Sequence, residues 1–180
     1  MKLSILISGT GGQGIIVAGE LLSKAFFKAG YNVINTHSYG AEARGGACKS
    51  ELLVSDEEIY DLSLTEADIL IAMCTPAYGR YIPQAKHRTI VILESSVVED
   101  LKKTGVKLRE DVETIAIPAK RLAENLGDVI VANMILIGAL VKKTGLIDLE
   151  VMKSVVEEGI RPTARKINLR ALENGFSSIN

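Results

Sequence analysis

The chain has 180 residues, a formal net charge of −1, 47% hydrophobic residues and only 4% aromatic residues. This length suits one domain with an aliphatic core, and the near-neutral charge gives no electrostatic reason to expect nucleic acid or an anionic membrane as a partner. The first residues lack a signal-peptide layout, and no apolar run approaches the roughly 20 residues of a membrane span. We therefore expect a cytoplasmic protein.

Strands and helices are expected to alternate along most of the chain. Apolar runs predict strands over 3–8, 31–36, 69–73, 90–93 and 112–117, and the alternating stretch 48–55 predicts a half-exposed strand in a hairpin with 58–60. Helical spacing predicts helices from Ile15 to a cap at Gly30, from Pro76, from Pro118 to Gly127, and over 131–143, 149–158 and 162–175.

This order predicts an open, mostly parallel, Rossmann-like α/β sheet with helices on both faces and a helical C-terminal region. We expect a single domain over 1–180, with an α/β core over 1–147 and a helical extension over 148–180.

A glycine-rich turn joins the first strand to the first helix. It consists of Gly9, Thr10, Gly11, Gly12, Gln13 and Gly14. In this setting Gly9 is expected to allow the tight turn, Gly11 the approach of a ligand and Gly14 close packing of helix and strand. Free N–H groups at the helix start then favour a phosphate. The alternative is a turn that only packs the helix, and Gln13 either reaches a ligand or caps the turn.

The pattern of a nicotinamide site is incomplete. Such a site places Asp or Glu at the end of the second strand. This chain has Thr36, His37, Ser38 and Tyr39 there. A Walker-type loop is also excluded, because no Gly-Lys-Ser or Gly-Lys-Thr follows the glycines. A self-contained NAD(P)- or FMN-dependent oxidoreductase is therefore kept only as an alternative.

A second glycine-rich segment follows the second strand. Its candidate binding residues are Ser38, Tyr39, Gly40, Glu42, Arg44, Gly45 and Gly46. The segment should emerge beside the first turn, at the sheet edge where ligands bind in open α/β folds. There the Tyr39 ring could stack or donate a hydrogen bond, and Arg44 could pair with a phosphate. The equally weighted alternative is a Glu42–Arg44 ion pair that only braces the loop.

The remaining polar candidates favour structural roles. Cys48 and Cys74 form no Cys-x-x-Cys pair, which argues against a zinc site or an iron–sulfur cluster carried by this chain. Cys74 follows an apolar strand and either faces the crevice or is packed, and packing is favoured. Asn133 either hydrogen-bonds a loop or marks a subunit contact, and the structural role is favoured.

Together the two glycine-rich segments resemble the gamma subunit of the 2-oxoacid:ferredoxin oxidoreductases. Further matching stretches lie at 68–73, 117–119, 131–134 and 137–139, and in the pattern Asn168-x-x-Ala171-x-x-x-Gly175. The segment Ser-Tyr-Gly-x-Glu-x-Arg-Gly-Gly is most similar to the 2-oxoglutarate branch, with pyruvate, ketoisovalerate and indolepyruvate enzymes as relatives.

The resemblance implies a complex that converts a 2-oxoacid and coenzyme A to acyl-CoA and carbon dioxide and reduces ferredoxin. It implies alpha and beta subunits that hold thiamine diphosphate and magnesium, with iron–sulfur clusters in beta and in a ferredoxin-like delta subunit. This chain would bind coenzyme A through the two segments and close the active site, with no catalytic residue or metal of its own. It could dimerise through the complex, and a ligand-free assembly subunit is the further alternative.

Overall fold

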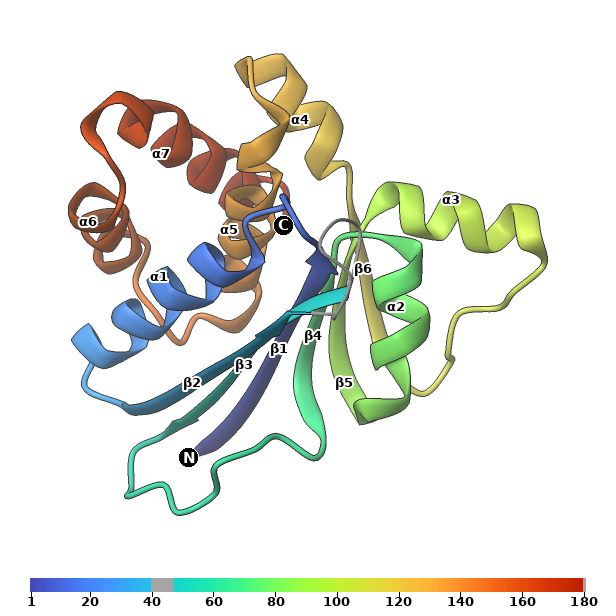
Figure 1. The fold of residues 1–180 in the computed structure, drawn as a ribbon, viewed down its shortest axis with the longest axis horizontal. Helices are drawn as coiled ribbons and strands as arrows, with labels where there is room; N and C mark the ends of the chain where they lie inside the picture. The colour runs from blue at the N-terminus through green and yellow to red at the C-terminus, as the bar shows by residue number, and fades with distance from the viewer. Residues whose placement is uncertain (40–46, 180) are drawn as a thin grey trace.

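The computed structural model describes residues 1–39 and 47–179 (Figure 1). The strands are β1 (Lys2–Thr10), β2 (Asn32–Tyr39), β3 (Ala47–Ser55), β4 (Ala67–Ala72), β5 (Ala85–Glu94) and β6 (Glu113–Ile117). The α-helices are α1 (Ile15–Lys28), α2 (Thr75–Tyr81), α3 (Ser95–Thr104), α4 (Ala119–Leu126), α5 (Ala132–Thr144), α6 (Leu149–Gly159) and α7 (Pro162–Ser177). Two short 3-10 helices are η1 (Ile82–Gln84) and η2 (Val129–Val131).

The strands form one mixed sheet in the order β2-β3-β1-β4-β5-β6. The pairs β1–β4, β4–β5 and β5–β6 are parallel, whereas β3 runs antiparallel to both of its neighbours. The expected mostly parallel α/β sheet is therefore confirmed, and so is the helical C-terminal region. Because β1, β2 and β4 to β6 point the same way, their carboxyl ends share one edge of the sheet.

The strand predicted over residues 48–55 is confirmed, but its predicted hairpin partner was wrong. Residues 58–60 form no strand, and β3 forms its hairpin with β2 instead. Strand β3 lies inside the sheet, between β2 and β1. No residue of β3 is exposed. Its polar face is the ion pair Lys49–Glu51, with Nζ and Oε1 2.6 Å apart. The alternating polar residues of β3 therefore mark a half-buried face whose two charges pair with each other, and not a fully exposed face.

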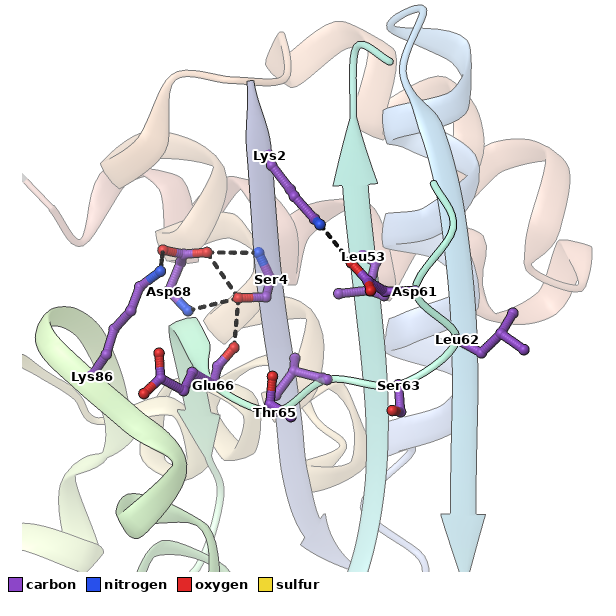
Figure 2. A pocket seen from close by; sticks show the side chains of 11 residues that line it. Lys2, Ser4, Leu53, Asp61, Leu62, Ser63, Thr65, Glu66, Asp68 and Lys86 are labelled. Atoms are coloured by element: carbon purple, nitrogen blue, oxygen red, sulfur yellow. Dashed lines mark hydrogen bonds and ion pairs between the residues drawn. The ribbon is translucent and has the colours of Figure 1, made fainter. Parts of the chain in front are cut away.

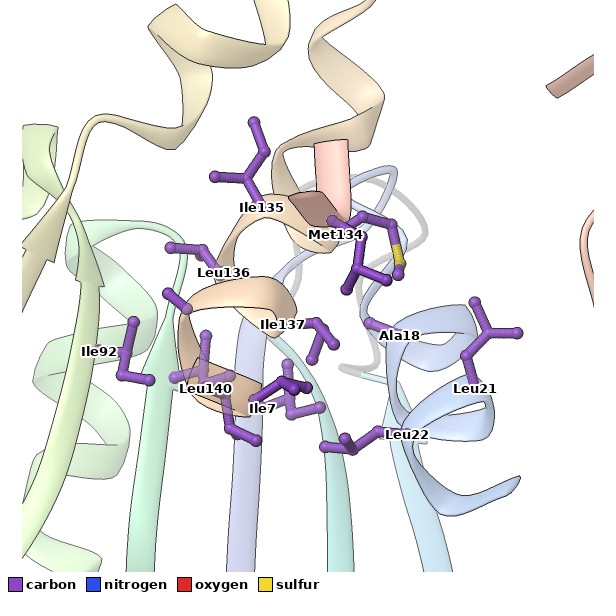
Figure 3. Close-up of a cluster of buried hydrophobic side chains, with 14 of the residues drawn as sticks. Ile7, Ala18, Leu21, Leu22, Ile92, Met134, Ile135, Leu136, Ile137 and Leu140 are labelled. Atoms are coloured by element: carbon purple, nitrogen blue, oxygen red, sulfur yellow. The ribbon is translucent and has the colours of Figure 1, made fainter. Parts of the chain in front are cut away.

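Helices cover both faces of the sheet. Alternate strand residues such as Ile5, Ile7 and Ile71 pack with α1, α5 and the C-terminal helices, whereas Leu6 and Leu70 pack with α2 and α3. Figure 3 shows the first of these clusters, in which side chains of α5 and α1 meet above the strands. Residues of α6 and α7 belong to the same cluster, so the C-terminal helices share the core of the sheet.

Helix α3 was missed in the sequence prediction. Its start carries a cap signal, because the Glu94 carboxylate accepts hydrogen bonds from the Ser96 hydroxyl and from the Ser96 backbone N–H, the latter at 2.8 Å. The other oxygen of Glu94 accepts from the Lys120 N–H at 3.4 Å, in the first turn of α4. Glu94 is 3% exposed and so links the starts of two helices at the carboxyl end of β5.

Two glycines allow α5 and α7 to pack closely. A Cβ added to Gly175 would stand 2.6 Å from the Ile135 carbonyl carbon, and one added to Gly138 would stand 2.8 Å from the Phe176 nitrogen. Neither position has room for a side chain, because both distances end on backbone atoms. The C-terminal helix is thereby held against α5, beside the start of α1 (Figure 1).

Candidate ligand-binding site

The glycine turn follows directly on β1, which extends through Thr10. Gly12 and Gly14 have φ values of 93° and 68°, a region that side chains rarely adopt, so the turn itself depends on these two glycines. Gly9 lies in the strand, where an added Cβ would stand 2.8 Å from Ile15 Cδ1. The expected roles are therefore corrected: Gly9 serves the packing of strand against helix, and Gly14 serves both the turn and close packing against Asn133 of α5.

Gly11 is the residue with open space around it. An added Cβ would meet no atom within 4 Å, and the residue is exposed. Its backbone is accessible to a ligand, which agrees with the role expected for it.

Gln13 caps the turn. Its Oε1 accepts a hydrogen bond from the Thr10 N–H at 2.7 Å, and its own N–H donates to the Thr10 carbonyl at 3.2 Å. Of the two roles left open for Gln13, the structure shows the structural one.

Asn133 attaches the start of α5 to the start of α1. Its Nδ2 donates to the Gly14 carbonyl at 3.0 Å, and its Oδ1 accepts from the Met134 N–H at 2.7 Å. Asn133 is buried, and its Nδ2 occupies the space that a Cβ on Gly14 would need. The expected hydrogen bond to a loop is confirmed.

The N-terminus of α1 is open to a ligand. Gly14 is its N-cap and supplies no side-chain hydrogen bond, and the first turn carries no acidic residue. The N–H groups of Ile15, Ile16 and Val17 have no partner within the helix, and the helix dipole places positive potential there. These groups adjoin the largest described cavity.

That cavity has a volume of about 620 Å³ and is called the glycine cavity below. It is lined by Thr10, Gly11, Gly12, Gly14, Ile15, Ile16, Val17, Cys48, Ile130, Asn133, Gly159, Ile160, Arg161, Ala164 and Asn168. Among the described residues of this lining, Arg161 is the one that carries a charge, and none is Asp or Glu. The volume of the glycine cavity falls within the range typical of binding sites for small molecules.

Sequence reasoning missed the part of this lining that follows α5. Ile160 and Arg161 lie in the connection between α6 and α7, and Ala164 and Asn168 lie on α7. The signals were present, because Gly159 and Pro162 mark a break between helices, and Asn168 belongs to one of the matching patterns. The spacing of these residues in the sequence does not show that the connection between α6 and α7 folds back beside the glycine turn.

The second glycine-rich segment lies partly outside the described residues. Gly40, Glu42, Arg44, Gly45 and Gly46 fall in the undescribed stretch, so their roles and that of the Tyr39 ring stay predictions. The strands on either side do adjoin the glycine turn, as expected. In the sheet register, Thr10 pairs with Ala47, Gly9 pairs with Cys48, and Cys48 pairs with Tyr39. Ser38 pairs with Lys49 and is exposed.

The two cysteines are free thiols. Cys48 is buried beside the glycine cavity, and burial raises the pKa of its thiol, so the protonated form is favoured near neutral pH. Cys74 is the N-cap of α2 and packs against the second core cluster. It is absent from the lining of the glycine cavity, which agrees with a packed thiol.

A second cavity, of about 410 Å³, lies at the opposite end of the parallel strands and is called the amino-end cavity (Figure 2). Its central group is Asp68, which accepts hydrogen bonds from the Ser4 N–H at 2.9 Å and Oγ at 2.8 Å and pairs with Lys86 at 2.5 Å. Burial raises the pKa of Asp68, but Lys86 and Ser4 outweigh it and hold that pKa below its usual value. Asp68, the half-buried carboxylate of this cavity, is thus neutralised by protein groups.

Within residues 1–39 and 47–179, no three His, Cys, Asp or Glu side chains are grouped as metal ligands. Over the same residues, no helix is both long enough and apolar enough to cross a membrane.

Comparison with known proteins gives the family. The family model of pyruvate ferredoxin/flavodoxin oxidoreductase matches residues 4–178. The chain belongs to this family. Among curated relatives, the 2-oxoglutarate synthase subunit KorC of Archaeoglobus fulgidus is 38% identical over 175 residues, which cover 97% of this chain and 87% of the relative. The resemblance found in the two glycine-rich segments is thereby confirmed.

Solved structures support the same family assignment. The gamma subunit of a keto/oxoacid ferredoxin oxidoreductase from Geobacter sulfurreducens has a TM-score of 0.82 and 31% identity and covers 97% of this chain and 96% of its own. The 2-oxoglutarate:ferredoxin oxidoreductase of Magnetococcus marinus, solved with 2-oxoglutarate, coenzyme A and succinyl-CoA bound, has a TM-score of 0.82 and 24% identity. It covers 98% of this chain and 30% of its own chain, and at this identity the likeness shows the fold. The pyruvate ferredoxin/flavodoxin oxidoreductase fold thus extends over nearly the whole chain.

Proposed function

We propose that this chain is the gamma-type subunit of a cytoplasmic 2-oxoacid:ferredoxin oxidoreductase that acts on 2-oxoglutarate. The complex would convert the 2-oxoacid and coenzyme A to acyl-CoA and carbon dioxide while ferredoxin is reduced. Its alpha, beta and delta subunits would carry thiamine diphosphate, magnesium and the iron–sulfur clusters. This chain would bind coenzyme A and cover the site of acyl transfer.

The observation that carries this proposal is the chemistry of the glycine cavity. Its lining by residues 1–39 and 47–179 combines open backbone at Gly11, the free N–H groups of the α1 start, one arginine and no carboxylate. Each of these features favours an anion. The other described cavities each include at least one acidic residue in their lining. A phosphate-bearing ligand is therefore best accommodated here.

The rest of the lining suits the remainder of coenzyme A. Ile16, Val17, Ile130 and Ile160 give the cavity an apolar wall, against which the pantetheine arm can pack. Val17 and Ile130 are 43% and 44% exposed, so this wall continues to the surface, where a partner subunit would present the acyl group.

The cavity offers binding rather than catalysis. The part of its lining that the structure describes includes no His, Asp, Glu or Lys that could act as a general acid or base. Cys48 is held as a thiol by burial, and the thiolate is the nucleophilic form. Acyl transfer would therefore depend on the thiamine-bearing partners.

The alternative of a self-contained NAD(P) or FMN enzyme loses support from the sheet order. In a dinucleotide-binding fold the second strand lies beside the first, and its end supplies the acidic residue for the ribose. Here β3 lies between β1 and β2. The end of β2 is thus one strand farther from the glycine turn, and its residue is Tyr39.

The test is Gly11→Leu, assayed in the complex co-purified with its partners. The side chain would enter open space without backbone strain, because the φ of Gly11 is not positive, so folding should persist while the KM for coenzyme A rises. The matched control is Gly79→Leu on α2, where an added Cβ also meets nothing within 4 Å. An unchanged KM for coenzyme A in an intact Gly11→Leu complex would favour the ligand-free assembly subunit. Purification of the chain without thiamine- or iron–sulfur-containing partners would contradict the complex itself.

A further inference from the structure

Arg161 is the single charged side chain among the described residues that line the glycine cavity. It immediately precedes Pro162 at the start of α7 and is exposed. Within residues 1–39 and 47–179 its guanidinium makes no hydrogen bond or ion pair. The connection that carries it is braced from within, because Arg165 Nε donates to the Ile160 carbonyl at 2.8 Å.

Arg161 and the glycine turn contribute to different parts of the cavity. The connection between α6 and α7 lies apart from the start of α1 in Figure 1, and the cavity is lined from both. Ile160 precedes Arg161 in that connection, and Ala164 and Asn168 line the cavity from α7. The cavity therefore has two separate points that attract an anion.

Coenzyme A carries phosphate at two separate places, the pyrophosphate and the 3′-phosphate of the ribose. The uncapped start of α1 suits the pyrophosphate, because several N–H groups face one site there. A forked guanidinium suits a terminal phosphate, whose free oxygens can accept two parallel hydrogen bonds. We infer that Arg161 binds the 3′-phosphate and makes the complex select coenzyme A over 3′-dephospho-coenzyme A. This inference rests on the proposed function.

The experiment compares kcat/KM for coenzyme A and for 3′-dephospho-coenzyme A in the assembled complex. The unaltered complex should prefer coenzyme A by about tenfold, the effect of one hydrogen-bonded charge pair, and Arg161→Gln should remove that preference. Arg161→Lys should keep part of it, because the charge remains but the fork is lost. The matched control is Arg170→Gln, an exposed arginine on the same helix outside the cavity lining, which should keep the full preference.

The outcomes separate the two proposals. If Arg161→Gln keeps the full preference, or if the unaltered complex has none, the inference about Arg161 is wrong. The proposed function then still stands as long as Gly11→Leu raises the KM for both ligands equally. If neither Gly11→Leu nor Arg161→Gln changes the KM for coenzyme A, both proposals fall. Thermal unfolding of each variant complex shows whether a lost preference reflects a lost fold.

Discussion

The two cavities at opposite ends of the sheet differ in how their polar groups are satisfied. In the amino-end cavity four charged side chains have protein partners: Asp68 pairs with Lys86 and Ser4, and Lys2 pairs with Asp61 at 2.5 Å (Figure 2). In the glycine cavity the first N–H groups of α1 and the guanidinium of Arg161 have none among the described residues. A polar cavity that satisfies itself stabilises the fold, whereas one that leaves donors open is suited to a ligand.

The largest effect is expected from a substitution in the amino-end cavity. Asp68→Asn removes the charge that pairs with Lys86 and weakens the acceptor for the Ser4 N–H. We expect the free energy of unfolding to fall by about 2 kcal/mol, measured by urea denaturation, while the KM for coenzyme A stays unchanged. A clear rise in that KM would mean that the two cavities are coupled and that the comparison is false.

The next effect alters the glycine cavity alone. Val17→Glu places a carboxylate beside the open start of α1, where it favours the helix but repels a bound phosphate. We expect the KM for coenzyme A to rise roughly tenfold, or about 1.4 kcal/mol, without a loss of stability. Val17→Gln is the neutral control of the same shape. Equal KM values for the two variants would show that no phosphate lies near α1.

A smaller effect concerns the pH dependence of stability. Lys86 and Ser4 hold the pKa of Asp68 below its unfolded value of 3.8. A lowered folded pKa gives stability that is present above 3.8 and is lost as the pH falls through the folded value. The difference in free energy of unfolding between the unaltered chain and Asp68→Asn should therefore be largest at neutral pH and should decrease below pH 3.8. If this difference does not change with pH, the loss of stability comes from packing and not from charge.

The smallest effect comes from the exposed ion pair at the rim of the amino-end cavity. The side chains of Lys2 and Asp61 are 63% and 60% exposed. Asp61→Asn should therefore cost less than about 0.5 kcal/mol of unfolding free energy. A loss as large as that of Asp68→Asn would show that the whole rim acts as one network.

Much of the fold could be predicted because its signals are local. Continuous apolar runs identified β4 and β5, and the glycines and prolines marked most helix ends. The position of β3 could not be predicted, since alternation along one strand does not reveal its neighbours. Lys49 and Glu51 lie two residues apart on one half-buried face of β3 and pair with each other, and in sequence such a face looks like one that is turned to solvent.

The same limit applies to the site. The glycine turn is contiguous in sequence, so its place between β1 and α1 and its open backbone could be predicted. Arg161 and Asn168 reach the cavity only because α7 packs on α5 through Gly138 and Gly175. That contact depends on the tertiary fold, and no spacing in the chain encodes it.

The insertion of β3 has a consequence for how this sequence can drift over evolutionary time. Thr10 and Ala47 are neighbours across a ladder of main-chain hydrogen bonds, as are Gly9 and Cys48. Because this link uses no side chain, substitutions at Thr10 and Ala47 can change what the two glycine-rich segments bind without separating them. Ligand preference can therefore diverge between descendants of this chain while the place where the segments meet is inherited unchanged.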